Sequence, residues 1–178
     1  MQDKQLSLKP LDIVVALQLT ITPECPFSAI GAAVGISHGE AHNSFRRLQR
    51  SRLTRPEKRS IAVERLLSFI LGGVPVAYPA SFGAETRGVP TAHSAPPMTT
   101  QLATDEEPLV WADAEGTVRG TTLTPLFPRA PALARSNQPL YELLALVDSI
   151  RIGRPGETAI ATSLLRDRLL AASRPAAR

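Results

Sequence analysis

Residues 30–50 read IGAAVGISHGEAHNSFRRLQR, and this stretch decides the fold that the sequence predicts. A helix that ends at Val34 places Gly35 in the left-handed exit position, where the absence of a Cβ removes a steric cost. Ser37 and Glu40 fit the capping box of a new helix, with Ser at the N-cap and Glu three residues later. One helix therefore ends and another begins within about three residues, a tight turn typical of a helix–turn–helix.

The second helix, expected at residues 38–51, separates its side chains by face. At about 100° per residue, one face is apolar and carries Ala41, Phe45 and Leu48. The opposite face is small or polar, with His42 and Arg47 at its flanks: Gly39, Asn43, Arg46 and Arg50. Small residues let a helix approach DNA closely, Asn pairs with adenine, and Arg pairs with guanine or binds phosphate. An amphipathic helix with a solvated basic face is the alternative explanation.

The positive charge of the chain gathers at this helix and just after it. Residues 37–65 contain eight Lys or Arg and three Glu, whereas the net charge of all 178 residues is only +4. Such a concentration is the electrostatic footprint of a phosphate-binding surface. We therefore predict contacts to double-stranded DNA from a set of polar and basic residues in this region: Ser37, His38, Gly39, His42, Asn43, Arg46, Arg47, Arg50, Arg52, Arg55, Lys58 and Arg59.

The stretch IGAAVGISHGEAHNSFRRLQRSRLT resembles the pattern of bacterial winged-helix transcriptional regulators, MarR-like ones among them, over roughly residues 10–72. The resemblance implies a trihelical domain, sequence-specific DNA binding by residues 38–51, transcription regulation and a dimer. Two departures stand out. Residues 51–53 lack the glycine usual after the recognition helix, and the wing expected at residues 53–60 is short or absent. Arg55, Lys58 and Arg59 in that segment either contact flanking phosphates or lie in a plain helix connection.

The whole chain is predicted to be α+β and to fall into three parts. Residues 1–78 form the winged-helix-like domain, with a buried helix at 11–19, a helix at 27–34, an amphipathic helix at 61–71 and a strand at 74–78. Residues 79–136 are rich in proline and show little periodicity; they contain loops and short strands, one at 109–111 paired with 74–78 and one within 118–127. Residues 137–178 form two helices, the first capped by Asn137 and the second opened by Pro155. This pair packs on the N-terminal part or forms a dimer interface.

Chemical motifs of catalysis are missing from the sequence, so we predict no enzyme, no catalytic residues, no metal and no cofactor. His38 and His42 have metal-ligand spacing, but no third ligand accompanies them. Residues 86–93, TRGVPTAH, form a loop that either packs across the domain or contacts a ligand. The acidic residues at 105–115 form either a flexible loop or a surface that docks on basic residues. An enzyme that joins Arg87 and His93 to Asp105 or Glu115 is a distant hypothesis.

The compartment and the partners follow from the same sequence. Cys25 is the only cysteine, which suits a reducing cytoplasm, and neither a signal core nor a long apolar run is present, so no membrane partner is expected. The leading hypothesis is a cytoplasmic DNA-binding regulator. The alternative is a protein-interaction adaptor or antitoxin-type partner that uses the same core and the C-terminal helices, because fold alone does not decide function.

Overall fold

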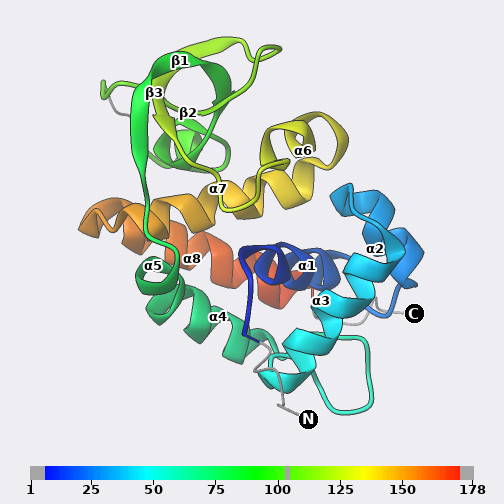
Figure 1. Cartoon of the computed structure of the whole chain (residues 1–178). Helices are drawn as coiled ribbons and strands as arrows, with labels where there is room; N and C mark the ends of the chain where they lie inside the picture. Colours follow the sequence, from blue (N-terminus) through cyan, green and yellow to red (C-terminus); the bar gives the residue numbers. More distant parts are fainter. Residues whose placement is uncertain (1–6, 103–104, 173–178) are drawn as a thin grey trace.

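The computed structural model describes residues 7–102 and 105–172 and confirms an α+β chain. In Figure 1 a small sheet lies at one end of the molecule, the first four helices lie at the other, and the last two long helices run between them. The elements follow in chain order: α1 (Pro10–Ile21), α2 (Phe27–Val34), α3 (His38–Arg50), α4 (Val63–Gly72), α5 (Val74–Ala77), β1 (Phe82–Pro90), η1 (Ala92–Ser94), η2 (Met98–Thr100), β2 (Leu109–Ala112), β3 (Val118–Leu123), α6 (Ala130–Ser136), α7 (Gln138–Ile152) and α8 (Pro155–Ala172).

Helix α1 is buried along nearly its whole length, as its apolar sequence predicts. Pro10 occupies its first turn, where the missing N–H leaves no bond unmade. Asp12 accepts a hydrogen bond from the Lys9 backbone N–H at 2.7 Å and so caps the helix start. The predicted helices at 27–34 and 61–71 are confirmed as α2 and α4, and α4 buries its apolar stripe in the common core.

The predicted strand at 74–78 is wrong, because this segment is the short helix α5. Its β-branched valines suggested a strand, but Pro75 lies in the first helical turn, where proline is tolerated. The pairing of this segment with residues 109–111 is therefore also wrong. Strand β2, which contains those residues, pairs instead with β1 and β3.

Within residues 7–102 and 105–172, the sheet has three strands, each of which pairs with both others. Strand β1 runs antiparallel to β2 and to β3, while β2 and β3 are parallel. Closing so few strands brings backbones into contact: a Cβ on Gly88 would lie 2.1 Å from the Trp111 carbonyl oxygen, and one on Gly120 the same distance from that of Pro108. The strand expected within 118–127 is confirmed as β3, but β1 was not expected, because most of it is exposed on both faces and shows no alternation.

A buried charge pair on α7 fastens the sheet to the helices. Oδ2 of Asp148 accepts hydrogen bonds from Thr91 Oγ1 at 2.8 Å and Trp111 Nε1 at 2.7 Å, and its Oδ1 accepts one from Arg151 Nη1 at 2.6 Å. The Arg151 guanidinium also donates to the carbonyls of Tyr78, Pro79 and Thr124. Burial raises the pKa of Asp148, and the charge of Arg151 acts against that rise.

The two C-terminal helices are confirmed as an antiparallel hairpin, joined at Gly153 in the left-handed conformation. Asn137 caps α7 and Pro155 opens α8, as the sequence predicts. One continuous apolar core joins side chains from all three predicted parts of the chain. Among the described residues, no helix is long and apolar enough to cross a membrane.

We predict that Asp148→Asn lowers the free energy of unfolding by about 3 to 5 kcal/mol, because it leaves the buried Arg151 guanidinium without its counter-charge. Urea unfolding monitored by circular dichroism measures the change. Asp167→Asn, the same substitution at an exposed position on α8, is the control and should stay within about 0.5 kcal/mol of the wild type. Equal stability of the two variants would show that the Asp148 contacts do not hold the sheet in place.

Candidate nucleic-acid interface

The turn between α2 and α3 has the geometry that the sequence predicts. Gly35 ends α2 with φ +78°, and its N–H donates to the Gly31 carbonyl at 2.8 Å. Ser37 Oγ accepts from the Glu40 N–H, and Glu40 Oε2 accepts from the Ser37 N–H, both at 3.1 Å. The predicted left-handed exit and the predicted capping box are therefore confirmed. The hydrogen bond from the Ser37 backbone lowers the pKa of Glu40, which keeps this carboxylate ionised in the cap.

Gly31 is the second glycine that this turn requires. A Cβ at this position would lie 2.7 Å from the Ile36 carbonyl oxygen, because the turn folds back against the last turn of α2. A contact this short with backbone cannot be relieved by moving a side chain. The requirement depends on how closely the turn returns to the helix, so the helical pattern alone gave no sign of it.

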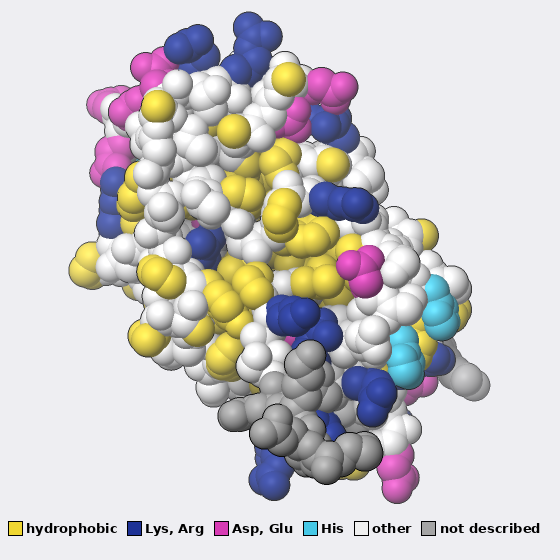
Figure 2. All heavy atoms as spheres, viewed as in Figure 1, with side chains coloured by type: hydrophobic (Ala, Val, Ile, Leu, Met, Phe, Trp, Pro, Cys, Tyr) yellow, Lys and Arg dark blue, Asp and Glu magenta, His cyan; other side chains and the backbone are white. Residues whose placement is uncertain are grey.

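The outer face of α3 is exposed and polar, whereas Ala41, Phe45 and Leu48 are buried in the core. The exposed predicted residues at the start and along this face are Ser37, His38, Gly39, His42, Asn43, Arg46 and Arg50. Both histidines approach the Phe27 ring edge-on, with ring centroids 5.9 Å away for His38 and 5.1 Å for His42. Figure 2 shows the exposed histidines at the edge of the molecule with Lys or Arg side chains close by.

Arg47 does not lie on this exposed face, contrary to the position that the sequence predicts for it, because its side chain is buried. Its Nε donates to Asp12 Oδ2 at 2.8 Å and its Nη2 donates to Asp12 Oδ1 at 2.6 Å. Ser44 Oγ also donates to Asp12 Oδ1, and both side chains lie inside the molecule. The hydrogen bonds to Asp12 raise the pKa of Arg47. Asp12 itself was the available signal, because an acid in an otherwise apolar helix needs a buried partner.

The region expected as a short wing is a tight hairpin that follows α3. One antiparallel bridge joins Thr54 to Ile61, and the Arg55 N–H donates to the Ser60 carbonyl at 2.9 Å. Arg55 and Lys58 are exposed on this hairpin. Arg59 is half-buried, with its guanidinium 5.2 Å from the centroid of the Phe27 ring, so less of it faces solvent than predicted.

Arg52 occupies the position after α3 where glycine is usual in the resembled pattern. It adopts φ +58°, a left-handed conformation that a non-glycine residue rarely takes, and its side chain is exposed. The chain therefore makes the same exit from the helix with an arginine. This exit leaves a further positive charge beside the outer face of α3.

The sequence predicted a loop at residues 86–93, and this prediction is wrong. Its first part belongs to β1, where Arg87 is exposed opposite Arg119, and its last residues, Thr91 and His93, are buried. His93 lies beside Glu157 of α8, away from the exposed strand surface that carries Arg87. The distant enzyme hypothesis required Arg87 and His93 to lie together, and the structure places Arg87 at the surface and His93 in the interior.

Three of the five acidic residues at 105–115 form ion pairs with arginines of the same chain. Arg135 of α6 pairs with Asp113 at 2.9 Å and with Glu115 at 3.2 Å. Arg154, just before α8, pairs with Glu106. For these three residues, docking on basic residues is the alternative that is observed. The basic residues that it uses lie outside α3, so the positive charge beside that helix is not neutralised by this stretch.

Comparisons with known protein families, curated proteins and solved structures found no match to this chain.

We predict opposite effects from two glycine substitutions. Gly31→Ala should lower the free energy of unfolding by about 1 to 3 kcal/mol, because the new Cβ meets backbone. Gly39→Ala should leave stability unchanged or raise it by up to about 1 kcal/mol, because the nearest atom to its Cβ would be 4.0 Å away and alanine favours a helix. Denaturant unfolding of both variants decides the matter; a stabilising Gly31→Ala would contradict the tight turn.

Arg46 and Arg47 give a second matched pair. Arg47→Met should destabilise the fold by about 3 to 5 kcal/mol, because it leaves the Asp12 carboxylate buried without its partner. Arg46→Met should change stability by no more than about 0.5 kcal/mol, since Arg46 is exposed. Thermal and urea unfolding of the two variants provide the measurement. If Arg46→Met destabilised the fold more than Arg47→Met does, the buried position of Arg47 would be contradicted.

Proposed function

We propose that this chain binds double-stranded DNA in a sequence-specific way through the outer face of α3, and that it regulates transcription as bacterial winged-helix regulators do. The observation that supports this most is the arrangement on α3. Asn43, Arg46 and Arg50 are exposed along one side of the helix, while the residues on its other side are buried. The backbone groups at both ends of α3 form hydrogen bonds within the chain, and its apolar face packs in the core. Its outer face is therefore the side that is free to contact a partner.

The dimensions and chemistry of α3 suit a major groove. With 13 residues, α3 is about 20 Å long at 1.5 Å per residue, and the groove admits a helix. Gly39 in the first turn carries no side chain that would hold the helix away from base edges. The amide of Asn43 matches adenine, and the guanidinium of Arg46 matches guanine.

Basic residues around α3 are proposed to hold the phosphate backbone. Arg50 lies in the last turn of α3, Arg52 follows in its left-handed exit, and Arg55 and Lys58 are exposed on the adjoining hairpin. The hairpin takes the place of the wing in this proposal. Arg47 has no part in it, because its Nε and Nη2 donate to the buried Asp12 carboxylate.

A dimer and a cytoplasmic location belong to the same proposal. Helix α7 is buried along most of its length within this chain, which leaves the outer side of α8 as the available surface of the C-terminal hairpin. A dimer formed there would present two copies of α3 to successive turns of DNA, as dimeric regulators do.

A role as a protein-interaction adaptor or antitoxin-type partner is the second candidate, and two exposed apolar side chains favour it. Val76 is 83% exposed and Phe82 is 51% exposed, both in the stretch that leads from the helices into the sheet. Exposed apolar side chains mark protein contacts where they form a patch, and these two are the large apolar side chains that stand out as exposed among the described residues. This surface differs from the acidic stretch at 105–115, in which Glu106, Asp113 and Glu115 form ion pairs within the chain.

Salt-dependent DNA binding tests the leading proposal. We expect Arg46→Ala with Arg50→Ala to weaken duplex binding at least about tenfold. The salt slope should fall by about 1, because Arg50 no longer neutralises a phosphate and binding then releases fewer counterions. Fluorescence anisotropy measures both quantities, on duplexes selected by sequencing the fragments that the protein retains at moderate salt.

The control variant removes two exposed arginines elsewhere, Arg87→Ala with Arg166→Ala, and changes the net charge equally. It should bind almost as the wild type does. Equal losses in both double variants would indicate attraction by net charge alone. Unimpaired binding by the α3 variant would leave the adaptor role as the better proposal.

A further inference from the structure

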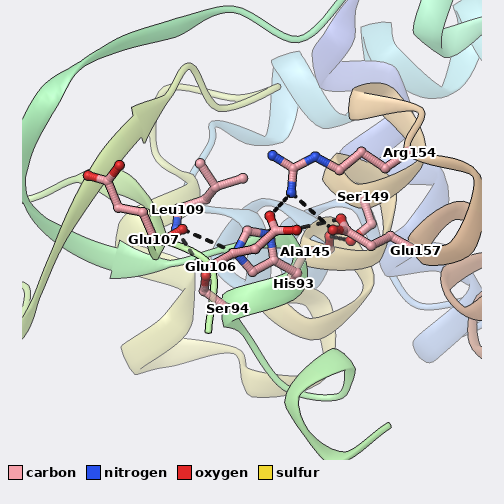
Figure 3. Close-up of polar contacts among 9 residues, drawn as sticks. All are labelled: His93, Ser94, Glu106, Glu107, Leu109, Ala145, Ser149, Arg154 and Glu157. Carbon is pink, nitrogen blue, oxygen red and sulfur yellow. Dashed lines mark hydrogen bonds and ion pairs between the residues drawn. The ribbon is translucent and has the colours of Figure 1, made fainter. Parts of the chain in front are cut away.

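Three side chains that lie far apart in the sequence meet between the sheet region and α8. They are His93 of η1, Glu106 before β2 and Glu157 in the first turn of α8 (Figure 3). One ligand atom from each lies within 4.8 Å of the other two. His93 and Glu157 are buried, whereas Glu106 is exposed, so the group reaches from the interior to the surface.

The ring of His93 is oriented by a backbone contact. Its Nε2 lies 3.2 Å from the Glu107 carbonyl oxygen, which only accepts hydrogen bonds, so Nε2 carries a proton. In the neutral ring, Nδ1 then presents a lone pair toward Glu157. Metal-bound histidines commonly have this arrangement, in which the second ring nitrogen donates to a carbonyl or carboxylate.

The atoms that face each other in this group are buried and unpaired. His93 Nδ1 lies 3.8 Å from Glu157 Oε2, and neither atom has a hydrogen-bond partner among the described residues. The His93 residue is 2% exposed and Glu157 is 7% exposed. Two buried acceptors that face one another are unfavourable unless a proton or a metal cation lies between them. At 3.8 Å the two atoms are too far apart to share a proton in a direct hydrogen bond, which favours a metal ion.

We propose that His93 Nδ1 and the carboxylates of Glu157 and Glu106 bind a divalent transition-metal ion of the zinc type. Imidazole nitrogen together with carboxylate oxygen is a ligand set that such ions favour. Three protein ligands leave a coordination position open, as in zinc sites that bind a small molecule. A pocket of about 490 Å³ lined in part by His93, Asp105 and Glu106 adjoins the group and gives that position access to solvent.

Arg154 would compete with the metal ion for the carboxylates of Glu106 and Glu157. Its Nη1 donates to Glu106 Oε2 and, at 3.1 Å, to Glu157 Oε1, so the guanidinium joins the two carboxylates. The oxygen that faces His93 is the other one, Glu157 Oε2. Arg154 is 43% exposed and can turn into solvent. Removal of Arg154 should therefore tighten metal binding. If Arg154 only held the two carboxylates in place, its removal would weaken metal binding or leave it unchanged.

Titration of untagged, chelator-treated protein with Zn²⁺ by isothermal calorimetry tests the proposal. We expect one saturable site per chain, and we expect Glu106→Gln and Glu157→Gln each to raise the Kd by about tenfold or more. Arg154→Gln should lower it. Glu107→Gln is the matched control, because its carboxylate points away from the group and only its backbone carbonyl contacts His93 (Figure 3). Zn²⁺ should raise the Tm of the wild type, and it should raise the Tm of the Glu107→Gln control by nearly the same amount.

His38 and His42 on α3 have metal-ligand spacing and could also bind Zn²⁺. The double variant His38→Ala with His42→Ala therefore belongs in the same series. Retained binding in this variant supports the site at His93. Binding that is lost with His38 and His42 but kept in Glu157→Gln would overturn the proposal, as would the absence of saturable binding to the wild type. A folded His93→Gln variant that binds Zn²⁺ as the wild type does would also overturn it. The result is independent of whether α3 binds DNA.

Discussion

A single buried carboxylate, Asp148, fixes how the sheet and the helices meet. It accepts hydrogen bonds from Thr91 at the end of β1 and Trp111 in β2, and its ion-pair partner Arg151 donates to backbone carbonyls where the chain enters and leaves the sheet. Buried charges are tolerated only when their bonding capacity is met, so few other arrangements of these segments would be stable. Asp148 and Arg151 thereby hold the connections between the two parts of the molecule, together with Tyr141 of α7, whose hydroxyl donates to the Pro90 carbonyl at 2.8 Å.

A second buried pair does the same for α3. Asp12 in the apolar helix α1 accepts hydrogen bonds from Nε and Nη2 of Arg47, and Ser44 adds a third donor. Apolar contacts alone leave a helix some freedom to rotate about its axis, whereas a bidentate pair specifies the angle. The exposed side of α3 is consequently set by an interaction inside the molecule. The proposed DNA contact depends on that orientation, although Arg47 itself reaches no partner.

Features with short-range signals could be predicted from the sequence. Gly35, the Ser37–Glu40 capping box and Asn137 mark helix ends through contacts with neighbouring residues, and all were predicted correctly. Features that depend on distant partners could not be predicted. Strand β1 lacks alternation because much of it faces solvent on both sides, α5 looked like a strand, and the residues around His93 come from three separate elements. Their proximity follows from the fold and not from any spacing in the chain.

The ribbon formed by β1 and β3 has a consequence for association between molecules. Among the described residues, the first part of β1, residues 82–86, pairs with β3 alone, so its other backbone edge is open to a strand of another chain. Such edges invite aggregation unless something interrupts them. Here the register shifts between Phe82 and Glu85, and Glu85 forms an exposed ion pair with Arg119. The irregular backbone and the charged side chains make the edge a poor template, so the chain can present a short exposed ribbon without polymerising through it.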